Sequence, residues 1–215
     1  MKSDYQLQHD VLDELVWQPS LDASQIGVTA KNGVVTLTGS VPQYVDKIEA
    51  ERIAKSIAGV KAVADEIDVR LIGTINDTDI ANAALYTLRW HSWIPNERIK
   101  VTVRDGWITL EGTVDWQYQR ESARDVVCHI HGVKGVTNQI GLTAKPQSKD
   151  IGSKIEAAFK RSAEVDARHV QVDACDNTVV LTGNVSSSAE RAEAERVAWA
   201  APGVTAVDNR LTVSV

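Results

Sequence analysis

The feature that most constrains this chain is a short phrase that occurs three times at nearly constant spacing. Residues 34–41 read VVTLTGSV, residues 107–114 read WITLEGTV and residues 178–185 read TVVLTGNV. The copies begin 73 and 71 residues apart. Solenoid repeats are shorter, at roughly 20–50 residues. This period is therefore typical of a small domain that occurs three times.

Turn-forming residues keep the same register inside each copy. Each copy contains three marker residues, and within each copy they are spaced 6 and then 20 residues apart. The markers are Gly33, Gly39 and Gly59; Gly106, Gly112 and Gly132; and Asn177, Gly183 and Gly203. Asn at one marker position fits, because Asn tolerates positive φ better than most residues. Equal internal lengths predict one fold built three times, as domains 1–72, 73–145 and 146–215, with linkers near 72–77 and 144–150.

Hydrophobic periodicity predicts the elements of each copy. Apolar residues at i, i+4 and i+8 predict a first helix in each: Leu7, Val11 and Leu15; Ile80, Ala84 and Leu88; Ile151, Ile155 and Phe159. Start signals for these helices are Ser3 or Asp4, Asp77, and Ser148 or Asp150. Two alternating strands, a second helix and a last strand follow, and Asn-Gly and Asp-Gly dipeptides predict tight hairpins.

The predicted fold class is α+β: three tandem α-β-β-α-β domains, each with two helices on one face of a three-stranded mixed sheet. Polar residues alternate with the buried strand residues, so only one sheet face is expected to be covered. Gly39 is expected to turn the chain toward the second helix, and Gly59 to end that helix as its C′ residue. The strand order stays open, because periodicity does not say which strands are neighbours.

Charge and hydropathy exclude some classes of protein. The net charge of -6 and the pI of about 5.4 argue against a general nucleic-acid binder. No apolar run approaches the ~18 residues that a membrane-spanning helix needs. The first residues, MKSDYQLQHD, do not resemble an export signal. We expect a cytoplasmic protein that could associate peripherally with a membrane. If an export signal has been removed, we expect a periplasmic protein instead.

No arrangement of residues predicts catalysis, a metal site or a cofactor. The sequence has no P-loop, GxGxxG, GxSxG or HExxH motif. His129 and His131, two residues apart on a helix, would point to different faces. Cys128 is expected on a partly exposed helix face, and Cys175 at a hairpin turn. The acidic runs 65–68 and 190–195 are expected to be solvated.

The repeated motifs resemble those of the BON domain. The relevant stretches are VTLTGSV followed by AGVKAV, ITLEGTV followed by HGVKGV, and VVLTGNV followed by PGVTAV. The resemblance covers nearly the whole chain, which looks like a relative of the osmotically induced BON-repeat proteins of bacteria. It implies a non-catalytic protein linked to stress tolerance, with an anionic phospholipid surface or a protein as partner and oligomers possible.

The tryptophans differ between the copies. Four of the six lie in the middle copy: Trp90, Trp93, Trp107 and Trp116. Trp93 aligns with Ser20 and Glu164, and Trp116 aligns with Gln43 and Ser187. A position that is polar in a sister copy is not a core position of the shared fold. We therefore expect these tryptophans near the surface.

The middle copy is also the best suited to approach an anionic surface. Its eight acidic and eight basic residues cancel, whereas the flanking copies carry -4 and -2. The hypothesis is a lipid or partner contact formed by Arg89, Trp90, Trp93, Trp107 and Trp116. The alternative is a scaffold in which the tryptophans pack one repeat against another. The sequence leaves both open.

Overall fold

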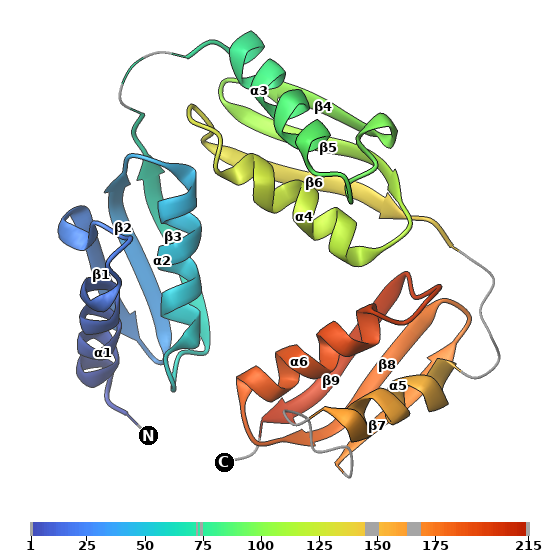
Figure 1. Ribbon diagram of the computed structural model, residues 1–215. Coiled ribbons are helices and arrows are strands. Elements are labelled where there is room, and N and C mark those ends of the chain that lie inside the picture. Colours follow the sequence, from blue (N-terminus) through green and yellow to red (C-terminus); the bar gives the residue numbers. More distant parts are fainter. Residues whose placement is uncertain (1, 72, 74, 145–150, 163–168, 214–215) are drawn as a thin grey trace. The chain divides into compact units, whose positions relative to one another are not determined.

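A computed structural model describes residues 2–71, 73, 75–144, 151–162 and 169–213 (Figure 1). These residues form three separate three-stranded sheets, each with two helices on one face. The predicted fold class is therefore confirmed. The domain boundaries stay predictions. Residues 145–150 of the predicted linker 144–150, with the helix start at Ser148 or Asp150, lie outside the described residues.

The three repeats have the same element order. The first contains α1 (Asp4–Trp17), β1 (Ile26–Lys31), β2 (Val34–Val41), α2 (Tyr44–Ser56) and β3 (Ala62–Val69). The second contains α3 (Asp77–Trp90), β4 (Ile99–Arg104), β5 (Trp107–Val114), α4 (Gln117–Cys128) and β6 (Gly135–Leu142). The third contains α5 (Ile151–Arg161), β7 (Val170–Cys175), β8 (Thr178–Val185), α6 (Ser188–Trp199) and β9 (Ala206–Val213). Short 3₁₀ turns, Ala23–Gln25 and Asn96–Arg98, precede β1 and β4.

The structure supplies the strand order that periodicity left open. The second strand of each repeat is the central one, giving the orders β1-β2-β3, β4-β5-β6 and β7-β8-β9. In the first repeat β2 pairs antiparallel with β1 through the hairpin and parallel with β3. The third repeat has the same two pairings. The second helix is thus the crossover that two parallel neighbours require.

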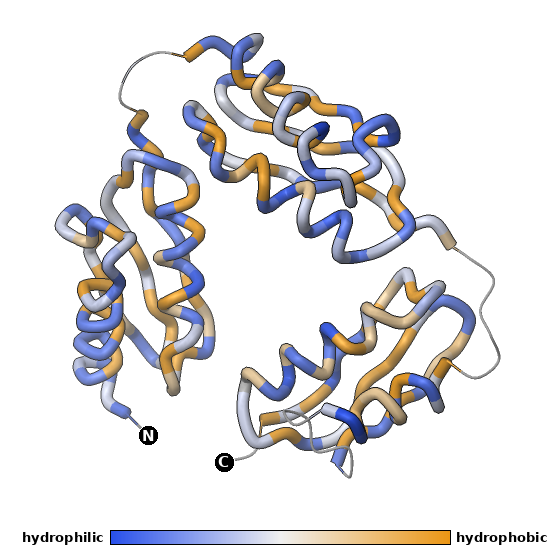
Figure 2. The backbone as a smooth tube through the Cα atoms, in the orientation of Figure 1, coloured by the Kyte–Doolittle hydropathy of each residue, from blue (hydrophilic) through white to orange (hydrophobic). Residues whose placement is uncertain are grey.

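Each repeat has its core between its helices and one sheet face. All nine apolar positions predicted for the first helices are buried: Leu7, Val11, Leu15, Ile80, Ala84, Leu88, Ile151, Ile155 and Phe159. In the first repeat, Leu7, Val11 and Leu15 share one buried cluster with inward strand residues such as Val35 and Leu37. Figure 2 shows hydrophilic and hydrophobic residues alternating along the helices, as expected where one face is buried.

The first residues of α1 and α3 join helix to hairpin. Ser3 caps α1 in a reciprocal capping box with Gln6, which confirms one predicted start signal. Asp4 Oδ2 accepts from Asn32 N at 2.9 Å, and Asp77 Oδ2 accepts from Asp105 N at 2.8 Å. Each carboxylate therefore fixes the hairpin turn at the N-terminal end of its helix.

Two expectations about glycines are wrong. Gly39 does not turn the chain toward α2, because it lies within β2 with φ +113°. A Cβ there would fall 1.9 Å from the carbonyl oxygen of Gln25, just before β1. Gly59 is not a C′ residue, because α2 ends at Ser56 with an extended cap at Ile57. Gly59 instead supplies φ +104° to the turn that leads into β3.

Two expectations about exposure are also wrong. Cys128, the last residue of α4, is buried rather than partly exposed. Glu190 is buried rather than solvated, and its carboxylate accepts from Ser186 N and Ser186 Oγ at 2.7 Å each. Glu190 lies in the first turn of α6, and its carboxylate is part of the N-terminal cap of that helix. This capping role accounts for the burial of the side chain.

Candidate contact surface on the second repeat

The outer face of α3 is aromatic at its C-terminal end. Ile80, Ala84 and Leu88 face the core, whereas the residues between them are half-buried or exposed. Tyr86 is 63% exposed and Trp90 is 70% exposed. Their rings meet edge to face with centroids 5.8 Å apart. Arg89 is exposed beside them. The last turn of α3 thus presents two amphipathic rings and a cation.

The loop after α3 adds a second exposed tryptophan. Ile94 is buried and its N–H donates to the carbonyl of His91 at 2.9 Å, which anchors the loop. Trp93 remains 50% exposed, and its ring lies 5.0 Å from that of His91 in an edge-to-face arrangement. The anchored loop holds Trp93 outward next to the end of α3.

Gln119 joins this loop to the start of α4. Its Oε1 accepts from the backbone N–H groups of Asp115 and Trp116 at 3.1 and 3.2 Å. Its Nε2 donates to the carbonyl of Trp93 at 3.1 Å. Trp116, which is half-buried, stacks on the exposed Tyr118 with centroids 6.5 Å apart. One amide side chain therefore holds Trp93 and Trp116 at the same end of the repeat.

We call this group the aromatic end. It comprises Tyr86, Arg89, Trp90, Trp93, Trp116 and Tyr118. The sequence hypothesis included Arg89 and the three tryptophans but missed the two tyrosines and Gln119. The spacing of Tyr86 and Trp90, i and i+4 on the predicted helix, could have revealed the first pair. Gln119 could have been recognised from its place in the first turn of the predicted second helix.

Trp107 does not belong to the aromatic end. It follows the hairpin turn that Asp77, the first residue of α3, holds through Asp105 and Gly106. The fourteen residues of α3, about 20 Å of helix, separate that turn from Trp90. Trp107 also lies on the helix-free sheet face, where its Nε1 donates to Thr137 Oγ1 at 2.8 Å. The structure therefore divides the five predicted contact residues between two places.

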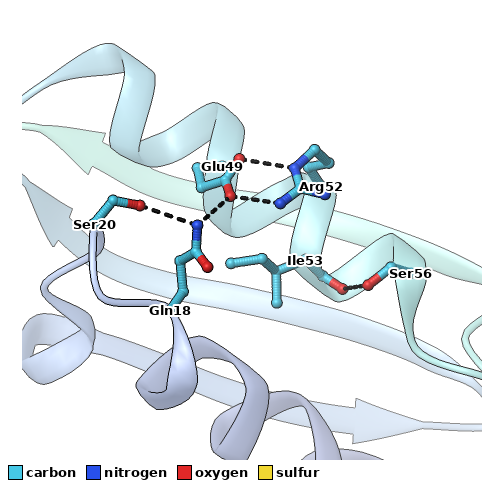
Figure 3. A network of polar contacts seen from close by, with 6 residues as sticks. All are labelled: Gln18, Ser20, Glu49, Arg52, Ile53 and Ser56. Atoms are coloured by element: carbon cyan, nitrogen blue, oxygen red, sulfur yellow. Dashed lines mark hydrogen bonds and ion pairs between the residues drawn. The ribbon is translucent and has the colours of Figure 1, made fainter.

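The first repeat has a polar network where the second has aromatic rings. Glu49 accepts from Arg52 Nε at 2.8 Å and Arg52 Nη2 at 2.6 Å, and also from Gln18 Nε2 at 3.0 Å (Figure 3). Gln18 further donates to Ser20 Oγ at 3.0 Å. Hydrogen bonding from Arg52 lowers the pKa of the Glu49 carboxyl. The network ties the end of α1 to α2.

In the second repeat, four different residues occupy these positions: His91, Trp93, Ser122 and Asp125. The acid–base pair is missing and an edge-to-face aromatic pair replaces the Gln18–Ser20 hydrogen bond. The third repeat retains the pair, as Glu193 and Arg196. The polar network of the first repeat is thus replaced in the second by an edge-to-face aromatic pair, while Trp17, the equivalent of Trp90, is exposed in the first repeat as well.

The remaining tryptophans lie on the other repeats. Trp17 ends α1 and is 81% exposed. Trp199 ends α6 and is half-buried against the core of the third repeat. Most tryptophans are therefore at or near the surface of their own repeat. The alternative, in which tryptophans pack one repeat against another, stays untested.

The described residues contain no group of three or more His, Cys, Asp or Glu that could hold a metal ion. His129 and His131 are exposed in the turn after α4, and His129 Nδ1 lies 2.8 Å from the carbonyl oxygen of Asp125. None of the described helices is long and apolar enough to cross a bilayer.

Comparison with curated proteins found a relative in Escherichia coli (strain K12), osmotically-inducible protein Y. The two are 32% identical over 132 residues, which is 59% of this chain and 66% of that protein. The matched stretch therefore spans slightly less than two thirds of the relative.

Comparison with solved structures found CdsD, a structural protein of the type III secretion system of Chlamydia trachomatis. One CdsD structure is 18% identical with a TM-score of 0.27, covering 97% of this chain and 92% of that one. A structure of the C-terminal domain of CdsD is 18% identical with a TM-score of 0.25, covering 100% of this chain and 100% of that one. At these identities and TM-scores, the similarity supports no conclusion about the function of this chain.

A comparison with protein families gives matches along most of the chain. The family described as BON domain matches residues 3–70, 76–144 and 147–214. These three matches follow the three structural repeats and include the motifs VTLTGSV, ITLEGTV and VVLTGNV. The chain therefore belongs to the BON domain family, of which it carries three copies.

Proposed function

We propose that this protein is a non-catalytic module that binds anionic phospholipid surfaces through the aromatic end of its second repeat. The observation that carries the proposal is the exposure of Trp90 and Trp93 at one corner of one repeat. Tryptophan and tyrosine rings favour the level of the lipid headgroups, where one part of the ring is apolar and another is polar.

The internal comparison supports a specialised role for this corner. In the first repeat Ser20 stands at the position of Trp93, beside the polar network of Glu49, Arg52 and Gln18, so the shared fold does not require an aromatic ring at that position. Exposed rings do not stabilise a core, and neighbouring exposed aromatic residues are typical of interaction sites. The substitutions in the second repeat are therefore better explained by binding than by folding.

Charge supports binding by the rings more than by long-range attraction. The whole chain carries -6, which opposes approach to an anionic membrane. The second repeat is neutral, and Arg89 lies beside Trp90. Arg98 is partly compensated by Asp115 at 3.3 Å. We expect shallow insertion of the rings, with only modest weakening by salt.

The relative's name connects the proposal with osmotic stress. Osmotically-inducible protein Y shares the BON repeats, and we propose that this chain likewise serves cells under osmotic stress. A surface that binds lipid headgroups without spanning the bilayer suits a peripheral role. The competing proposal, a protein-interaction scaffold, would use the same exposed rings on a protein partner.

Co-sedimentation with vesicles of phosphatidylglycerol and phosphatidylethanolamine tests the proposal. The wild-type protein should sediment with the vesicles, and the double variant Trp90→Ala/Trp93→Ala should bind at least about tenfold more weakly, equivalent to ~1.4 kcal/mol. Trp17→Ala is the matched control, because Trp17 is the exposed equivalent of Trp90 in the first repeat. It should sediment like the wild type.

Two results would contradict lipid binding. One is a wild-type protein that stays in the supernatant at every vesicle concentration. The other is a double variant that sediments as well as the wild type. A defined oligomer in light scattering that dissociates in the double variant, together with no sedimentation, would favour the scaffold.

A further inference from the structure

The last strand of the second repeat, β6, lies at one edge of its sheet (Figure 1). Among the edge strands that the structure describes, β6 alone has no charged residue. Its equivalents carry several, since β3 contains Asp65, Glu66 and Asp68, and β9 contains Asp208 and Arg210. Charged side chains on an edge strand oppose pairing with another chain, so β6 lacks a protection that the flanking repeats have.

A basic side chain of the second helix also covers this edge in the flanking repeats. Lys47 Nζ donates to the carbonyl of Ile67 in β3 at 2.6 Å, and Arg191 Nη2 donates to the carbonyl of Asn209 in β9 at 3.1 Å. Arg120 occupies the same position in the second repeat. Its side chain makes no hydrogen bond or ion pair with another residue in the described part of the chain. The edge at β6 therefore lacks this cover too.

Two glycines of β6 lie on the helix-free face of the sheet. A Cβ on Gly135 would fall 2.4–2.6 Å from three atoms of the Trp107 ring, which occupies that space. A Cβ on Gly141 would meet nothing closer than 3.8 Å, and the φ of Gly141 is not positive. The first repeat has Asp68 at this position and the third has Thr212. Nothing within the repeat therefore requires Gly141, and a glycine in a strand is typical of close approach by another backbone or a ligand.

The two glycines are symmetric about Asn138, three residues away on either side. In an antiparallel pair of strands related by a two-fold axis, residues directly opposite each other point to the same sheet face. If β6 pairs with β6 of a second copy about Asn138, Gly135 lies opposite the partner's Gly141. The same pairing of β3 would set Asp65 opposite a second Asp65, and like charges in that position are destabilising.

Trp107 has a specific place in this pairing. Its Nε1 donates to Thr137 Oγ1 at 2.8 Å, which holds the ring over Gly135 on the edge strand. The ring is nevertheless 49% exposed. Directly opposite residues of paired strands lie ~4.5–5.5 Å apart, within reach of an aromatic side chain. The open part of the ring can therefore pack on the partner's Gly141, where a larger side chain would take its space.

We propose that β6 is a dimerisation edge, at which two copies of this chain pair antiparallel about Asn138 and each Trp107 ring packs on the partner's Gly141. The two three-stranded sheets then form one six-stranded sheet with the helices of both copies on the same face. A second copy fits better than an unrelated extended segment, because only self-pairing uses the symmetric spacing of the two glycines. This edge is distinct from the aromatic end and does not depend on lipid binding.

Sedimentation equilibrium of the full chain at concentrations up to ~1 mM tests the pairing. The wild type should show a reversible monomer–dimer equilibrium, since one pair of strands is a small interface. Gly141→Asp should weaken the dimer at least about tenfold, because it places an acid on the edge strand. This variant should fold, because Asp68 occupies the position in the first repeat. Thr102→Asp is the matched control. It adds the same charge to the other edge strand, β4, where the third repeat has Asp173, and it should dimerise like the wild type.

Two further variants separate this edge from the aromatic end. Trp107→Val should also weaken the dimer at least about tenfold, and it should fold because Val34 occupies the position in the first repeat. Trp90→Ala/Trp93→Ala should dimerise like the wild type. In hydrogen exchange, raising the concentration of the wild type should protect amides of β6 and leave those of β4 unchanged.

Three results would overturn the proposal. A wild type that stays monomeric up to ~1 mM would exclude self-pairing. A dimer that persists in both Gly141→Asp and Trp107→Val, with circular dichroism showing both variants folded, would place the contact elsewhere. Loss of the dimer in Trp90→Ala/Trp93→Ala, or concentration-dependent protection confined to α3, would assign the contact to the aromatic end.

Discussion

The glycine of the repeated motif shows how one residue can be required without taking part in chemistry. Gly39, Gly112 and Gly183 all have positive φ, and a Cβ on any of them would fall within 2.0 Å of a carbonyl oxygen. In each repeat that oxygen belongs to the residue that precedes the first strand. The motif is therefore retained in all three repeats because two segments of backbone approach closely there.

Gly39→Ala should destabilise the first repeat by more than about 3 kcal/mol, because a backbone clash is added to an unfavourable φ. Gly59→Ala is the matched control, since it also has positive φ but its nearest neighbour is 3.6 Å away. The control should cost only about 1–2 kcal/mol. Urea denaturation of both variants makes the comparison. Equal destabilisation would mean that φ alone, and not the close approach, explains the motif glycine.

The ion pair at Glu49 predicts a pH effect. Hydrogen bonds from Arg52 lower the pKa of Glu49 below 4.5 in the folded protein. A depressed folded-state pKa contributes stability that is present above the unfolded pKa and is lost as the pH falls through the folded pKa. The first repeat should therefore lose this contribution below about pH 4.5. Because the pair is largely at the surface, the effect should stay small.

Hydrogen exchange of α2 amides against pH measures this effect. Glu49→Gln should reduce protection of the helix at neutral pH and remove the part of the acid dependence that Glu49 contributes. Arg52→Gln should give the same change, since both variants remove one interaction. An unchanged acid profile in both variants would show that the pair does not stabilise the repeat.

At the scale of elements, the repeats keep one framework and vary one corner. The first helix, hairpin and second helix coincide in type and order, while the loop after the first helix changes from Gln18 and Ser20 to His91 and Trp93. Gln119 then fastens that loop to α4. The exposed rings of the aromatic end thus rest on a helix end and a loop that are both anchored.

Gln119→Ala should loosen the start of α4 and the Trp93 loop together, at a cost of about 1 kcal/mol, as for loss of a helix cap. Faster hydrogen exchange at the Asp115 and Trp116 amides would report it. Gln117→Ala is the matched control, because Gln117 donates to Glu121 on the same helix and does not cap it. If both variants exchange alike, Gln119 does not hold the two segments together.

Sequence reasoning predicted the elements and the buried helix faces because periodicity is a local property. Ile80, Ala84 and Leu88 are one example, and each is buried. The strand order depends on pairing between distant segments, which no local pattern records. Trp107 and Trp116 also show this limit. They are near in sequence, but the length of β5 separates the hairpin turn beside Trp107 from the capped start of α4 beside Trp116.

At the scale of the whole molecule, the chain consists of three BON domains of one architecture and unequal surfaces. The flanking repeats are acidic and keep the acid–base pair on the second helix, and the middle repeat is neutral and carries four of the six tryptophans. Binding functions proposed for the protein fall on the middle repeat for that reason. The flanking repeats should then affect stability and solubility more than vesicle binding.

The aromatic end of the second repeat, and not tryptophan in general, should enter the lipid headgroup region. The most direct measurement is fluorescence quenching by brominated phosphatidylglycerol in two single-tryptophan proteins, one retaining only Trp93 and one only Trp17. Trp93 should show quenching and a blue shift, and Trp17 should show neither. Equal quenching of both, or quenching of Trp17 alone, would contradict it.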